Sequence, residues 1–203
     1  MTKKYFITGI STEVGKTIAS AILVEALEAD YWKPIQAGDL GYSDTDKVKE
    51  LISNSTSVFH PNSYALQTPM SPHASAEIDG VKISLKEIKE PKTKNNLVIE
   101  GAGGLLVPLN DEDTILDIIQ PDYKVILVSR HYLGSINHTL LTVNLLKGKG
   151  FDVSIIFSGD EYSTTESIIK KMTGVSVLGR IEDEPYFDQN VIKEYADKFR
   201  EKL

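Results

Sequence analysis

The chain has 203 residues, 41% of them hydrophobic and 25% charged, a length and balance that suit one globular domain with a substantial core. The net charge of −7 argues against a nucleic-acid-binding surface, and the absence of cysteine excludes disulfides, thiolate metal sites and cysteine nucleophiles. No stretch is long and apolar enough to span a bilayer, and residues 1–4 lead into a strand without a signal-like apolar segment. We therefore expect a soluble cytoplasmic protein, with residues 1–203 forming a single domain.

The stretch GISTEVGKT, residues 9–17, joins two apolar patterns. Residues 5–7 before it are typical of a buried strand, and residues 18–27 after it have helical character. A strand, a loop ending Gly-Lys-Thr and a helix make the setting of a phosphate-binding loop, because the loop amides and the helix N-terminus converge on an anion. In such a loop Lys16 would add a positive charge near the outer phosphates, and the Thr17 hydroxyl would ligate Mg2+.

The glycine spacing of this loop departs from the usual pattern. Five residues separate Gly9 from Gly15, whereas the usual phosphate loop has four. The alternative interpretation is an ordinary turn between a strand and a helix, with a solvated lysine. The context and the Gly-Lys-Thr ending both favour the phosphate loop.

A second strand is expected over residues 31–35. Pro34 cannot continue a regular ladder, so Lys33 is expected at the end of the strand, where ligands bind in α/β sheets. Asp44 and Asp46 then give a short amphipathic helix an acidic start.

Strand and helix patterns alternate along the rest of the chain. We expect a long loop over residues 53–72, helices beginning near 74 and 85, strands over 96–100, 125–128, 153–157 and 175–178, and helices over 134–145, 163–172 and 188–202. Alternation of this kind implies parallel pairing with right-handed crossovers. The predicted fold is α/β: a doubly wound, mainly parallel sheet of six or seven strands flanked by helices.

Polar residues stand at the ends of three expected strands. Lys16 and Thr17 follow the first, Lys33 follows the second, and Glu100 follows Leu-Val-Ile and precedes the glycine-rich residues 101–104. These strand ends are expected to meet at one edge of the sheet. A buried Glu100 needs a partner, which a Mg2+ ion shared with Thr17 and nucleotide phosphates would supply. The alternatives are a solvated strand-end glutamate and an exposed lysine beside a proline.

Two other classes of enzyme find no support in the sequence. His60, His73, His131 and His138 lack the spacing of metal ligands, which argues against a zinc hydrolase. No Gly-x-Ser-x-Gly motif is present, so a serine hydrolase is not indicated.

Five sequence blocks follow one another along the chain. They are GxxTEVGKT at residues 9–17, KPIQxG at 33–38, SPHxxA at 71–76, EGAGG at 100–104 and LGxINHxL at 133–140. In this order, and with the five-residue gap in the first block, the chain resembles the dethiobiotin synthetases of the P-loop NTPase superfamily.

The resemblance implies an ATP- and Mg2+-dependent ring closure in biotin biosynthesis. In that reaction CO2 carboxylates one amine of 7,8-diaminononanoate to a carbamate, and the γ-phosphate of ATP converts the carbamate into a mixed anhydride. The second amine then closes the cyclic urea of dethiobiotin and releases phosphate, leaving ADP. Such chemistry requires charge neutralisation more than a strong base, because a carbamate oxygen must approach a polyanionic phosphate.

The resemblance also implies roles for individual residues, with Lys33 and Lys16 as the catalytic pair. The residues expected to bind ATP are Glu13, Val14, Gly15, Lys16, Thr17, Ile18, Asp46, Glu100, Gly101, Ala102, Gly103, Gly159 and Asp160. The residues expected to contact the diamine substrate are Thr12, Lys33, Ala37, Gly103, Gly134, Ser135, Ile136 and Asn137. Thr17, Asp46 and Glu100 would hold Mg2+, with Asp44 as the alternative to Asp46. In the family the turn at 134–137 comes from the partner subunit, so a homodimer is implied.

The chain departs from the family pattern at three places. Ala37 stands where relatives have a hydroxyl residue that touches the substrate. Gly159 lacks the amide side chain with which relatives read adenine, and residues 178–185 lack their simple Ile-Pro turn. We therefore expect ATP to be used but to be discriminated less strictly from other nucleotides.

The sequence also allows two other functions. One is a nucleotide-switched positioning or regulatory ATPase of the same superfamily, but those proteins carry an additional lysine early in the loop, and residues 10–12 contain none. The other is a catalytically silent nucleotide-binding module. The acidic net charge also disfavours a DNA-binding role.

Overall fold

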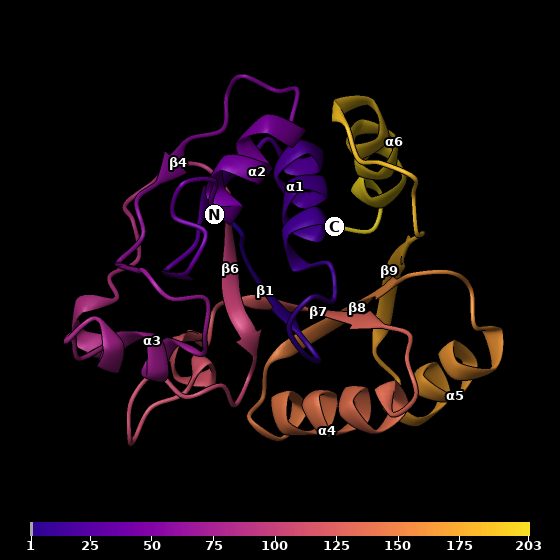
Figure 1. Cartoon of the computed structure of the whole chain (residues 1–203). Helices are drawn as coiled ribbons and strands as arrows, with labels where there is room; N and C mark the ends of the chain where they lie inside the picture. Colours follow the sequence, from indigo (N-terminus) through magenta and orange to yellow (C-terminus); the bar gives the residue numbers. More distant parts are fainter. Residues whose placement is uncertain (1) are drawn as a thin grey trace.

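A parallel sheet of seven strands runs through the centre of the protein in the computed structural model, which describes residues 2–203 (Figure 1). The strands lie in the order β4-β2-β6-β1-β7-β8-β9. They are β1 (Lys4–Gly9), β2 (Asp30–Trp32), β4 (Phe59–His60), β6 (Leu97–Gly104), β7 (Lys124–Arg130), β8 (Asp152–Ser158) and β9 (Ser176–Ile181). The chain builds the β4 side first and then crosses β1 to build the β9 side, which confirms the predicted doubly wound α/β fold.

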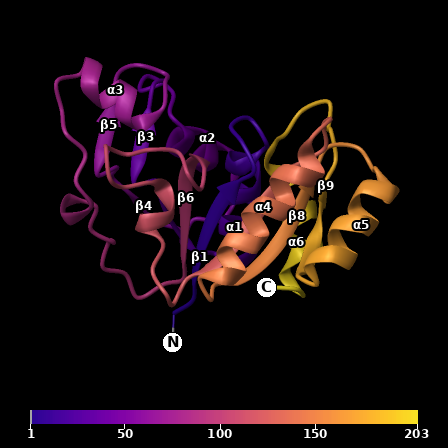
Figure 2. The same cartoon turned by 90° about the horizontal axis from the view of Figure 1, so that it is seen from below.

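Helices cover both faces of the sheet (Figures 1 and 2). One face carries α1 (Lys16–Leu27), α2 (Asp44–Leu51) and α6 (Gln189–Arg200), and the other carries α4 (Ser135–Gly148) and α5 (Ser163–Thr173). The shorter helices are α3 (Pro72–Ile78) and two 3-10 turns, η1 (Leu85–Glu87) and η2 (Ile115–Ile118). Among residues 2–203, no helix combines the length and the hydropathy that crossing a membrane requires.

The central strand β1 is apolar on both sides because helices cover both faces of the sheet. Tyr5 and Ile7 pack with Ile22 of α1 in one core cluster. Phe6 points the other way and packs with Ile99 of β6 in a second cluster. The loop after β1 is therefore held from both faces of the sheet.

The predicted strand over residues 31–35 is wrong in its extent, because the chain changes sheets at Pro34. β2 ends at Trp32, and β3 (Ile35–Ala37) pairs instead with β5 (Tyr64–Leu66) in a separate two-stranded sheet. The carbonyl of Pro34 accepts hydrogen bonds from the amides of Ser63 and Tyr64, at 2.8 and 3.0 Å. Proline has no N–H to continue the β2 ladder, so the break leaves Lys33 at the end of β2.

The predicted loop over residues 53–72 is also wrong in part, because it contains β4 and β5. Tertiary contacts impose these strands on a polar sequence: the buried Glu25 carboxylate accepts hydrogen bonds from the amides of Ser53 and Asn54, at 2.9 and 3.0 Å. The Tyr31 amide then donates to the carbonyl of Val58 at 2.9 Å, which adds this segment to the sheet edge.

Candidate active site

The main cleft, about 1440 Å3 in volume, lies at the carboxyl ends of β1, β2 and β6, where α/β sheets bind ligands. The predicted site residues that line it are Thr12, Glu13, Gly15, Lys16, Thr17, Ile18, Lys33, Ala37, Glu100, Ala102 and Gly103. Val14 lies behind the loop in the core, and a side chain at Gly101 would meet the Phe6 ring at 3.1 Å. The sequence prediction that the three strand ends share one edge is confirmed by this lining.

The loop between β1 and α1 is held in a tight conformation that its glycines permit. A Cβ at Gly9 would lie 2.5 Å from the Val14 side chain and 2.6 Å from the carbonyl oxygen of Ser11. Gly15 has a φ of 94°, a left-handed conformation that glycine adopts readily, and α1 begins at the next residue. The helix N-terminus therefore opens directly onto the cleft, as an anion site requires.

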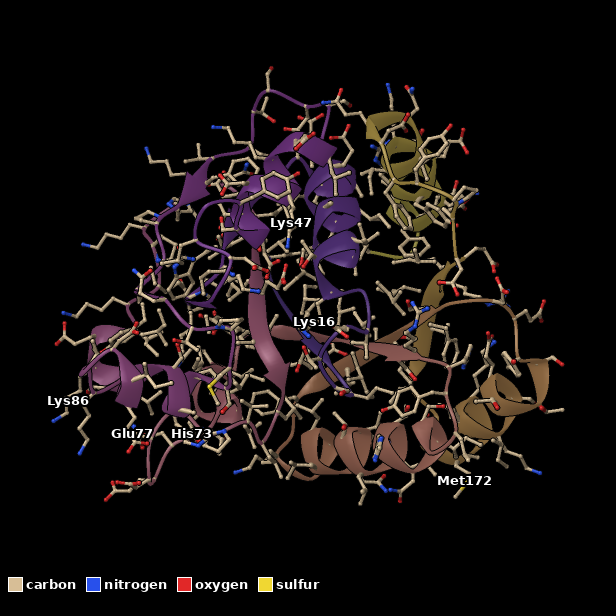
Figure 3. The ribbon with its side chains drawn as sticks, in the orientation of Figure 1. Lys16, Lys47, His73, Glu77, Lys86 and Met172 are labelled. Atoms are coloured by element: carbon tan, nitrogen blue, oxygen red, sulfur yellow. The ribbon has the colours of Figure 1, made fainter. Side chains whose placement is uncertain are left out.

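Lys16, labelled in Figure 3, is the first residue of α1, and its ammonium contacts the loop before the helix. Its Nζ donates to the Ser11 carbonyl at 3.2 Å, and the residue is only 7% exposed. Burial lowers the pKa of Lys16, and the nearby positive Lys33 lowers it further, against the opposing effect of Glu100. An anion entering the cleft would relieve the repulsion between these two ammonium groups.

Lys33 is at the centre of a charged cluster that also contains Glu100 and Asp44. Its Nζ donates to Glu100 Oε1 at 2.9 Å and to Asp44 Oδ2 at 2.5 Å. Burial disfavours the ammonium, but Glu100 and Asp44 together outweigh burial and raise the pKa of Lys33. The lysine is therefore a fixed positive charge.

The structure brings Asp44, and not Asp46, to this cluster. Asp46 is exposed and forms a capping box with Ser43, accepting from the Ser43 amide at 2.8 Å and hydroxyl at 2.7 Å. Asp44 lines the cleft and also accepts from Lys47 at 3.3 Å. Burial opposes the charge on Asp44, but Lys33 and Lys47 lower its pKa, so it remains a carboxylate.

The oxygen atoms around Lys33 are of the chemical type that binds magnesium. Glu100 Oε1 accepts from the Thr17 hydroxyl at 3.1 Å, and both Glu100 and Asp44 contact the same ammonium. Two carboxylates and a hydroxyl are hard oxygen donors, the type that Mg2+ prefers, and Mg2+ commonly completes its shell with water and substrate phosphates. Within residues 2–203 no group of three or more acidic, histidine or cysteine side chains is placed to hold a metal ion by protein ligands alone.

Tyr31 is a residue of the cluster that the sequence interpretation missed. Its hydroxyl donates to Glu100 Oε2 at 2.9 Å, and burial, followed by the charges of Glu100 and Asp44, raises its pKa well above the usual value. Strand periodicity is the signal that would have found it, because Tyr31 and Lys33 are two residues apart and point to the same face.

The turn of residues 134–137, which was predicted to contact the substrate, does not line the cleft of its own chain. The lining does not include Gly134, Ser135, Ile136 or Asn137. It does include His138 and Leu141, which lie further along α4. Gly134 begins α4 with a φ of 105°.

The predicted nucleobase residues are not among the residues that line the cleft. Gly159 has a φ of 93°, and a Cβ there would face a carboxylate oxygen of Asp183 at 3.6 Å. Asp183 pairs with Arg130 at 3.1 Å, and Arg130 does line the cleft. Neither Gly159 nor Asp160 lines it.

The loop, the sheet order and the cleft together define a P-loop nucleotide-binding protein. Residues 3–191 match a protein-family profile described as an AAA domain. A plasmid partition protein from Borrelia burgdorferi has a similar structure, with a TM-score of 0.60 and 16% identity over 98% of this chain and 96% of that chain. A ParA family ATPase from Chlorobium tepidum has a TM-score of 0.57 and 11% identity over 98% and 91%. At these identities the likeness shows the fold alone.

Sequence relatives identify the family within that class. The ATP-dependent dethiobiotin synthetase BioD of Christiangramia forsetii is 66% identical over 100% of this chain and 99% of that protein. The protein of the same name from Cytophaga hutchinsonii is 51% identical over 97% and 96%, and that from Chlamydia pneumoniae is 40% identical over 98% and 90%. The chain belongs to the dethiobiotin synthetase family, which confirms the resemblance found in its sequence.

Proposed function

We propose that this protein is an ATP- and Mg2+-dependent dethiobiotin synthetase, which closes 7,8-diaminononanoate and CO2 into a cyclic urea. The observation that carries the proposal is the pair of buried lysines, Lys16 and Lys33, in the lining of one cleft. A phosphate loop needs only the first of them to bind a nucleotide. The second is a fixed positive charge at the end of the neighbouring strand, where a second anion, the carbamate, would lie beside the phosphates.

In the proposed mechanism both lysines stabilise negative charge. The loop amides and Lys16 hold the phosphates of ATP, and Lys33 steadies the carbamate oxygen that attacks the γ-phosphorus and displaces ADP. Negative charge that develops on the transferring phosphoryl group is stabilised by both ammonium groups. The second amine then attacks the carbonyl carbon of the mixed anhydride, and phosphate leaves as the ring closes. Thr12, Ala37 and the backbone at Gly103 are proposed to face the diamine.

Thr17, Glu100 and Asp44 are the residues that would hold Mg2+ when it is bound with ATP. The ion would supply charge neutralisation of the phosphate oxygens. The geometry favours Asp44 over Asp46 for this role, since Asp44 contacts Lys33 and Asp46 is engaged in capping its own helix. The resulting site uses one acidic residue from α2 and one from β6.

We further propose a cytoplasmic homodimer in which each subunit completes the other's substrate site. Leu133, on the turn before α4, is fully exposed, and Leu106 and Leu141 are more than half exposed at the rim of the cleft. Exposed leucine side chains at these positions would suit a contact with a second subunit. The turn of residues 134–137 would then reach the partner's cleft, where helix N–H groups would bind the distal carboxylate of the diamine substrate.

Product analysis tests the proposed reaction directly. With ATP, Mg2+, bicarbonate and 7,8-diaminononanoate, we expect mass spectrometry to find the cyclic urea, with phosphate release in step with it. ATP turnover should need both the diamine and bicarbonate, because the carbamate is the acceptor of the phosphoryl group. Turnover without them, and without product, would instead support a positioning or regulatory ATPase.

We expect nucleotide selectivity to be loose, since Gly159 offers no side chain to read the base. The kcat/KM values for CTP and GTP should lie within about 10²-fold of that for ATP, whereas hydrogen-bonded reading of a group discriminates by about 10⁴-fold. Steady-state rates with a nucleotide panel measure this ratio. A discrimination of about 10⁴-fold against both would mean that other groups read adenine.

A further inference from the structure

The Tyr31 hydroxyl lies beneath the charged cluster at the end of β2. Tyr31 is 0% exposed, and its Oη donates to Glu100 Oε2 at 2.9 Å. Tyr31 pairs in register with Val98 of the neighbouring β6, two residues before Glu100. Tyr31 and Lys33, two residues apart at the end of β2, therefore approach Glu100 on the same face of the sheet.

The hydrogen bonds to Glu100 divide between its two carboxylate oxygens. Oε1 accepts from Thr17 Oγ1 at 3.1 Å and from Lys33 Nζ at 2.9 Å, on the side of the cleft. Oε2 accepts from Tyr31 on the side of the core. The carboxylate is only 1% exposed, so water does not compete for this second oxygen. Tyr31 is the one donor to Oε2 among the hydrogen bonds of the described residues.

We propose that Tyr31 is a positioning residue that orients Glu100 toward the metal–nucleotide complex. The assignment rests on the metal site of the proposed function. Without the hydroxyl, Oε2 would be a buried acceptor with no donor, and the carboxylate would turn to share Lys33 and Thr17 between both oxygens. If Oε2 turned toward the cleft, the orientation in which the Glu100 carboxylate binds the metal ion would change. Hydrogen bonds from residues outside the ligand set normally fix that orientation.

Tyr31→Phe removes the hydroxyl and leaves the ring, so it creates no large cavity. Tyr5→Phe is the matched control: Tyr5 is 2% exposed, lies in the same core cluster, and its hydroxyl donates to the Leu203 carbonyl at 3.1 Å. Both variants lose one buried hydroxyl, but only one of these hydroxyls contacts Glu100. Thermal unfolding of each variant measures the purely structural effect.

The deciding measurement is Mn2+ affinity in the complex with a non-hydrolysable ATP analogue, followed by electron paramagnetic resonance. We expect Tyr31→Phe to weaken Mn2+ binding by about tenfold, the usual effect of losing an outer-shell partner, and Tyr5→Phe to leave it unchanged. The Mg2+ concentration for half-maximal turnover should rise in parallel, with kcat at saturating Mg2+ nearly restored. Because Mn2+ binding needs no turnover, it stays informative even if the reaction itself is not the one proposed.

A double-mutant cycle separates positioning from general damage. In a Glu100→Gln background, Tyr31→Phe should cause no further loss of Mn2+ affinity, because the tyrosine acts only through that carboxylate. An equal loss in both backgrounds would overturn the proposal. So would a Mn2+ affinity of Tyr31→Phe that matches the wild type, or an equal loss in Tyr5→Phe.

Discussion

Replacing Lys33 by alanine is expected to lower kcat by about 10²–10³-fold, the usual effect of removing a preorganised group that stabilises transition-state charge. Lys33 is 4% exposed and contacts Glu100 and Asp44 at 2.9 and 2.5 Å, so solvent cannot replace its ammonium in the same place. Its raised pKa keeps it charged across the physiological range. The loss should therefore appear as a uniform drop in kcat, without a new ionisation in the pH profile between pH 6 and 9, roughly the range below the lysine reference value.

Lys47→Ala is the comparison that separates position from total charge. Lys47 also contacts Asp44, but its side chain is 35% exposed and it reaches Glu100 by no hydrogen bond of the described structure. We expect its loss to cost less than about tenfold in kcat, as partly exposed ion pairs are weak. Steady-state kinetics of both variants, with thermal unfolding to confirm folding, measure the difference. Intact turnover in Lys33→Ala would refute the proposed mechanism.

The contact between Lys33 and Glu100 could be predicted from the sequence, because it depends on the order of the strands in the sheet. Residues at the carboxyl ends of neighbouring parallel strands lie at one edge, and the chain pattern fixes which strands are parallel. The choice between Asp44 and Asp46 was not predictable in the same way. Both begin one helix, and which carboxylate caps it depends on the direction in which the chain enters, which Ser43 sets.

The extents of the strands escaped prediction for a related reason. Pro34 is visible in the sequence as a break, but nothing local says that residues 35–37 join a second sheet. Residues 59–60 pair with the edge of β2, and residues 64–66 pair with β3, while Glu25 holds the start of this polar segment by hydrogen bonds. Tertiary contacts override local propensity in such segments.

The proposed dimer leads to the second large effect. Leu133 is fully exposed on the turn just before residues 134–137, which are proposed to enter the partner's cleft. We expect Leu133→Asp to raise the dimer dissociation constant by about 10²-fold or more, because a carboxylate buried without a partner in an apolar contact is costly. Turnover should then fall with dilution as the dimer dissociates. Binding of an ATP analogue should change little, because the phosphate loop lies within one chain.

Met172→Asp makes the same change of charge on α5, where Met172 is 61% exposed and is labelled in Figure 3. It should leave both assembly and turnover unchanged. Sedimentation across a range of protein concentrations gives the dissociation constant, and rates at the same concentrations test whether activity follows the dimer. A monomeric Leu133→Asp variant with full activity would show that one chain holds the complete substrate site. Activity that rises with the dimer fraction would instead require a group from the second subunit, since the cleft of one chain gains no contact from its own residues 134–137.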